Sequence, residues 1–151
     1  MQTRRRCGSF DTDRMPDSNV DRLRSGYDAL GRGDYEAIRS LLDPEIVLRD
    51  RPEVPDARSY LGYEGMLTTL RDTSDSFEDF RLTPERFFEH GDKVVVVLSM
   101  TGRGRTSGVP VEERIAHVWT LKEGLAVELR AFTDPADALE AAGLPRTLIS
   151  E

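Results

Sequence analysis

Three side chains of this sequence could together perform acid–base chemistry on a small molecule: a carboxylate, a phenol and an imidazole. Asp50 follows a short apolar segment, and a carboxylate in a mostly apolar pocket has the raised pKa that suits a general base. Tyr27 lies at helical spacing from Leu23 and Leu30, so its phenol points inward and can donate a hydrogen bond to a substrate oxygen. His117 titrates near neutral pH and lies in a predicted strand.

Two of these residues also have a purely structural interpretation. Asp50 stands between Arg49 and Arg51, and a loop carboxylate paired with arginines has a lowered pKa, which disfavours a base. An inward tyrosine such as Tyr27 is often a core residue whose hydroxyl meets a carbonyl. The sequence therefore leaves both roles open for each residue.

The role of His117 depends on which face of its strand looks inward. Ile115, His117 and Trp119 share one face, because successive residues of a strand point to opposite sides. If this face lines the interior, His117 and Trp119 form the wall of a pocket. If it faces outward, they form a dimer surface.

The elements that position these residues begin with helices. Ser18 caps a helix that ends at Gly31 and Gly33, and Asp34 caps a second helix, which we expect to include Leu42 and to end at residues 43–44. Residues 46–48 predict a short strand. A loop follows to about residue 62, and residues 63–77 predict a third helix.

The second half of the chain is rich in β-branched and aromatic residues, and Gly-containing turns separate its segments. It predicts an antiparallel meander of residues 80–89, 93–103, 111–121 and 125–132. Asp134-Pro135 then begins a last helix, which ends at Gly143. This order predicts an α+β fold in which a curved antiparallel sheet wraps on the N-terminal helices as a cone, whose interior is the default ligand site.

Composition excludes several classes of protein. The 151 residues carry a formal charge of −7, which argues against nucleic acid as a partner. The apolar runs are too short to span a membrane. One cysteine excludes an internal disulfide, and two histidines offer little for a metal site.

Four segments in this order resemble the NTF2-like superfamily, and within it the SnoaL-like proteins. They are residues 33–38 with 46–50, residues 60–66 (Tyr-Leu-Gly-Tyr-Glu-Gly-Met), residues 116–124 (Ala-His-Val-Trp-Thr-Leu-Lys-Glu-Gly) and residues 138–144. Together they cover about residues 19–144. The resemblance implies the cone fold but no single reaction, since one fold hosts many functions.

The superfamily includes ketosteroid isomerases, polyketide cyclases and dehydratases, together with non-catalytic binding domains. When the sequence is aligned with the isomerases, Asp50 falls on the position of their catalytic base, which is an aspartate. The isomerase tyrosine falls on Gly26, one residue before Tyr27, and the second aspartate falls on Ala116, beside His117. This comparison favours Ala116 and Val118 as the inward residues of their strand.

We therefore predict a cofactor-free isomerase, cyclase or lyase that acts on a small apolar molecule with a carbonyl group. Asp50 would be the base, and Tyr27 or His117 would stabilise the oxyanion. The alternative is a non-catalytic dimeric domain that binds a ligand or supports a partner. The residues expected to line the ligand site are Tyr60, Met66, Met100, Arg114, Ala116, Val118, Trp119 and Leu129.

The organisation of the chain follows from the same features. Residues 1–17 are expected to be a disordered or mis-annotated leader, residues 18–144 the SnoaL-like domain, and residues 145–151 a tail. The absence of a signal sequence predicts a cytoplasmic protein. The resemblance, and more Val, Ile and Trp than one cone can bury, predict a homodimer through the sheet.

Overall fold

The computed structural model describes residues 18–49 and 59–149, without the side chains of residues 59–61. The predictions made for residues 1–17, for Asp50 and for the side chain of Tyr60 lie outside this part of the chain.

Two capped helices open the described chain. Helix α1, Asn19–Arg32, begins where the Ser18 hydroxyl accepts the Asp21 N–H, and it ends at Gly33, which adopts the left-handed conformation at φ 72°. Helix α2, Tyr35–Arg39, is capped by Asp34. Both caps confirm the prediction. The second helix is shorter than expected, because the chain is already extended at Leu42.

A mixed six-stranded sheet in the order β3-β2-β7-β6-β5-β4 forms the centre of the fold. The strands are β2 Leu42–Arg49, β3 Ser59–Leu61, β4 Phe77–His90, β5 Lys93–Gly104, β6 Pro110–Lys122 and β7 Leu125–Phe132. Strands β4 to β7 form the predicted antiparallel meander. Strand β2 pairs in parallel with β7, and β3 occupies a segment where we had predicted a loop.

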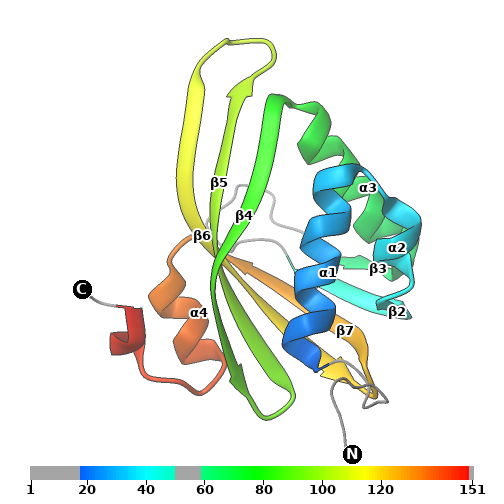
Figure 1. The fold of residues 1–151 in the computed structure, drawn as a ribbon, viewed down its shortest axis with the longest axis vertical. Helices are drawn as coiled ribbons and strands as arrows, with labels where there is room; N and C mark the ends of the chain where they lie inside the picture. The colour runs from blue at the N-terminus through cyan, green and yellow to red at the C-terminus, as the bar shows by residue number, and fades with distance from the viewer. Residues whose placement is uncertain (1–17, 50–58, 150–151) are drawn as a thin grey trace, which may run out of the picture.

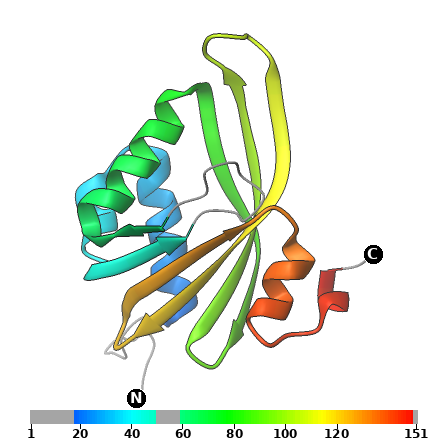
Figure 2. The same ribbon diagram turned by 180° about the vertical axis from the view of Figure 1, so that it is seen from behind.

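Helices cover both faces of this curved sheet (Figures 1 and 2). Helices α1, α2 and α3, Gly62–Asp75, lie on one side, and α4, Pro135–Ala141, lies on the other with the short 3₁₀ helix η1, Arg146–Ile149. The apolar residues form two clusters, one under α1–α3 and one under α4. The predicted α+β class is confirmed.

Strand β5 shows how the two clusters share the sheet. Residues 94–98 are all fully buried. Val94, Val96 and Leu98 belong to the cluster under α1–α3, whereas Val95 packs in the cluster under α4. The four valines of β5 are therefore covered within one chain, and the dimer stays a prediction.

Candidate functional site

A hydrogen-bonded cluster of Tyr27, His117 and Trp119 lies between α1 and the sheet. The Trp119 indole Nε1–H donates to the Tyr27 hydroxyl oxygen at 2.9 Å, and this oxygen lies 2.7 Å from Nδ1 of His117. The exposed fraction is 6% for Trp119, 7% for Tyr27 and 9% for His117. The structure thus joins two predicted catalytic residues and one predicted lining residue in a single buried network.

The positions of these residues follow from the periodicity of their elements. Tyr27 belongs to the buried stripe of α1 with Leu23, and His117 and Trp119 share a face of β6. The Tyr27 and His117 rings are stacked with centroids 6.0 Å apart, and Trp119 meets both edge-on. This packing fixes the orientation of each ring.

The three side chains of the cluster line a cavity of about 40 Å³, whose surface is almost wholly apolar. The other described residues that line it are apolar; they include Met66 and Leu129, which we had predicted to line the site, and Leu30 and Leu82. A water needs roughly 10–15 Å³, so the cavity holds a few small groups. Pockets for drug-sized ligands measure about 300–1,000 Å³.

The chemistry of the cluster follows from its donors. Burial raises the pKa of the Tyr27 phenol well above its ordinary value of 10.0, and the hydrogen bond from Trp119 offsets part of this rise. Tyr27 is therefore neutral. Because the indole N–H only donates, the Tyr27 oxygen accepts from Trp119. With Nδ1 of His117 unprotonated, the phenol donates to it; with Nδ1 protonated, the phenol oxygen accepts from both rings and its own proton turns away from them.

The structure corrects the predicted orientation of Ala116 and Val118. Both pack under α4 with Phe132 and Leu139, on the side of the sheet away from the cavity. The apolar face of α4 needs this partner, which the comparison with isomerases could not reveal. The open question about His117 is thereby answered, since it faces the cavity with Trp119.

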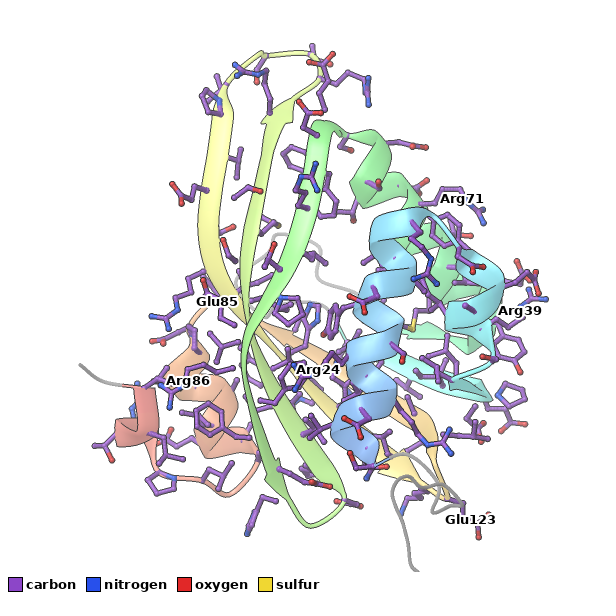
Figure 3. All side chains as sticks on the ribbon, viewed as in Figure 1. Arg24, Arg39, Arg71, Glu85, Arg86 and Glu123 are labelled. Carbon is purple, nitrogen blue, oxygen red and sulfur yellow. The ribbon has the colours of Figure 1, made fainter. Side chains whose placement is uncertain are left out.

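Two further predicted lining residues lie away from the cavity wall. Met100 packs at the edge of the core under α1–α3 and does not line the cavity. The Arg114 Nε lies 3.3 Å from a carboxylate oxygen of Glu85, and both side chains are exposed. Glu85 points to the side of the sheet away from α1 (Figure 3). The structure thus places Arg114 in a surface ion pair.

Sequence reasoning missed the contribution of Gly26. This glycine, at the position of the isomerase tyrosine, lines the cavity beside Tyr27. A Cβ there would lie 3.0 Å from Cδ1 of Leu41, so the absence of a side chain permits close packing of the cavity wall. Leu30, which shares the stripe of Tyr27, could have been found from its helical spacing.

The described part of the chain also bears on metal binding and on membrane insertion. No group of three or more His, Cys, Asp or Glu side chains there is arranged to hold a metal ion. None of the helices in residues 18–49 and 59–149 is both long and apolar enough to cross a membrane.

With this fold and cavity in place, comparison of the sequence with protein families identifies the class. The SnoaL-like domain family matches residues 23–129, from α1 to β7. The chain belongs to this family. No curated protein matches the sequence.

Solved structures agree with this assignment. An NTF2-like protein from Burkholderia thailandensis E264 is 24% identical, with a TM-score of 0.72 over 86% of this chain and 100% of the other. A putative SnoaL-like polyketide cyclase from Jannaschia sp. CCS1 is 22% identical, with a TM-score of 0.70 over 89% and 99%. A protein of ketosteroid isomerase-like fold from Catenulispora acidiphila, in complex with trimethylamine, is 15% identical, with a TM-score of 0.67 over 85% and 97%. These similarities define the fold.

Proposed function

We propose that this protein binds a small, uncharged, carbonyl-bearing molecule in the cavity and moves a proton on it without a cofactor. The observation that carries the proposal is the Tyr27–His117–Trp119 network on an otherwise apolar wall. An apolar cavity disfavours a charged ligand, because an unpaired charge loses its hydration there. A carbonyl oxygen needs one donor, which the neutral Tyr27 phenol can supply.

The network suits proton transfer next to a carbonyl group. When a base removes a proton from the adjacent carbon, the electron pair moves onto the carbonyl oxygen, and a donor at that oxygen stabilises the resulting enolate. Tyr27 is the donor in this proposal, and its oxygen accepts from Trp119, which strengthens the phenolic O–H as a donor. The resemblance to isomerases assigns the base to Asp50, which lies outside the described residues.

A non-catalytic binding domain is the second candidate, and the size of the cavity favours it. At about 40 Å³ the cavity leaves little room for a substrate beside a base. The Tyr27 hydroxyl already has two partners within the chain. Some NTF2-like relatives bind small ligands, such as the Catenulispora acidiphila protein with trimethylamine. In this alternative the network only shapes the cavity.

The deciding experiment measures hydrogen–deuterium exchange at the carbon next to the carbonyl of butan-2-one, with and without the protein. Catalysis predicts that the wild type accelerates exchange and that Asp50→Asn and Tyr27→Phe each lower the rate by about 10²-fold or more. Tyr63→Phe is the matched control, because Tyr63 lies under the Arg39 guanidinium, away from the cavity.

Titration of Asp50 and His117 by NMR gives an independent reading. A carboxyl pKa well above about 3.9, with a His117 curve that changes in Asp50→Asn, supports a shared enclosed site. Binding without faster exchange, together with uncoupled titrations, would leave the non-catalytic function. Absence of any shift at His117 and Trp119 with butan-2-one would contradict both functions.

A further inference from the structure

A second and much larger hollow adjoins the cavity. It is a groove of about 560 Å³ between the C-terminal half of α1 and residues 79–84 of β4. Tyr27, Leu30 and Leu82 line both the groove and the cavity. The two spaces are therefore neighbours that share these three residues as a wall.

The shape of the groove follows from the path of β4, which is an edge strand of the sheet. Its register with β5 shifts between Glu78 and Arg81, and Asp79 within this bulge has a positive φ of 55°. Such a backbone conformation costs a non-glycine residue about 1–3 kcal/mol, and residues that adopt it cluster at binding sites. β-Bulges likewise occur next to active sites, where they change the direction in which a side chain points.

The groove ends where α1 and β4 come into contact. The Arg24 guanidinium lies over the Phe87 ring at 4.5 Å from its centroid, and Figure 3 shows Arg24 between the two elements. Arg24 precedes the groove residues of α1, and Phe87 follows those of β4. The Arg24–Phe87 contact therefore lies beyond the groove residues of both elements.

The charges around the groove balance. Asp28 and Asp79 line it together with Arg32 and Arg81, and the Arg32 guanidinium lies 3.6 Å from Asp34. Two carboxylates and two guanidinium groups in one groove do not favour a ligand with a single charge, since such a charge would meet one of its own sign nearby. They do offer hydrogen-bond donors and acceptors to an uncharged polar group.

We propose that the groove is the second half of the ligand site, and that the ligand is amphipathic: its small carbonyl-bearing head enters the cavity, and its uncharged, hydrogen-bonding tail lies between α1 and β4. This inference rests on the proposed binding function. The volumes support it, because about 40 Å³ admits only part of a molecule larger than a few heavy atoms, whereas the groove measures about 560 Å³.

Gly31 allows a direct test. It lines the groove within α1, and a Cβ at this position meets nothing within 4 Å. Gly31→Leu therefore adds a bulky side chain to the groove at a position where the Cβ is unobstructed, and leucine is a good helix former. Asp28→Leu, on the exposed side of the same groove, is a second blocking variant. Ser25→Leu adds the same side chain to the exposed surface of α1 outside the groove and is the control.

The experiment measures dissociation constants by NMR for butan-2-one and for a long-chain methyl ketone that ends in a hydroxyl group. Each methylene that the groove buries tightens binding by about fourfold. We expect the long ketone to bind at least tenfold more tightly than butan-2-one to the wild type and to Ser25→Leu. Gly31→Leu and Asp28→Leu should lose this gain and keep the affinity for butan-2-one.

The outcomes separate this inference from the proposed function. If both ketones bind the wild type equally, or if both blocking variants keep the full gain, the groove is not part of the site, although the cavity still binds. If neither ketone shifts the His117 and Trp119 resonances, the cavity function itself fails. Selective shifts of the amides of residues 79–84 with the long ketone would support the groove.

Discussion

Removing one oxygen atom tests the physical reasoning behind the site. Tyr27→Phe keeps the ring but leaves the Trp119 N–H and Nδ1 of His117 without their shared partner, both inside the core. A buried polar group that loses its partner costs about 1–3 kcal/mol. Since two such groups are left, we expect the free energy of unfolding to fall by about 2–6 kcal/mol.

Equilibrium unfolding in urea measures this change, and Trp119→Phe completes a double-mutant cycle. Because both substitutions break the same hydrogen bond, their effects should not add, and we expect a coupling energy of about 1–2 kcal/mol. Tyr63→Phe, a tyrosine outside the cavity, should change stability by less than about 0.5 kcal/mol. The reasoning would be refuted if Tyr27→Phe cost no more than Tyr63→Phe, or if the two substitutions were additive.

The raised pKa of Tyr27 also predicts that the protein loses stability at alkaline pH, and Tyr27→Phe tests this. Since burial raises the pKa of Tyr27 above 10.0, the folded chain keeps a proton that the unfolded chain loses above that pH. The contribution of Tyr27 to the free energy of unfolding is therefore complete below pH 10.0. It declines as the pH rises above this value, by about 1.4 kcal/mol per pH unit. Urea unfolding between about pH 9 and about pH 11 should show this slope in the wild type but not in Tyr27→Phe. Equal slopes would mean that the phenol is not held protonated.

Three other substitutions extend the test to the frame of the site, each measured by urea unfolding. Gly31→Ala should raise stability by about 0.5–1 kcal/mol, because the position is helical and open; a loss would contradict the open groove. Gly143→Ala should lower stability by about 1–2 kcal/mol, because φ is 85° and the new Cβ would lie 3.2 Å from Cε1 of His90. Arg114→Ala should change stability by less than about 1 kcal/mol, because its pair with Glu85 is exposed; a larger loss would give Arg114 a role that we do not assign.

Local signals predicted most of the elements. Ser18 and Asp34 were recognised as helix caps, because capping depends on residues three positions apart. Strand β7 has the predicted bounds. The failures are non-local. Asp43-Pro44 indicates the end of a helix, yet it lies in β2, where the pairing with β7 is interrupted between Leu42 and Val47 and a proline is tolerated.

The sequence predicted five of the residues that line the cavity, but not the network among them: Tyr27, Met66, His117, Trp119 and Leu129. Periodicity placed Tyr27 inward and put His117 on the face of Trp119, yet no pattern relates residues that are 90 positions apart in sequence to a hydrogen bond. The orientation of β6 was equally beyond a local pattern, because both faces of this strand are apolar. The deciding contact comes from α4, which follows the whole sheet in sequence.

Helix α4 therefore fixes the composition of a cavity that it does not touch. Ala138 and Leu139 are fully buried against the even-numbered residues Ala116 and Val118 of β6. Because side chains alternate along a strand, burying the even positions under α4 commits His117 and Trp119 to the cavity. A shift of β6 by one residue in register would exchange its odd-numbered and even-numbered side chains between the two faces of the sheet. The imidazole of His117 would then lie under α4. The docking of α4 on the far side of the sheet thus determines which residues of β6 line the cavity.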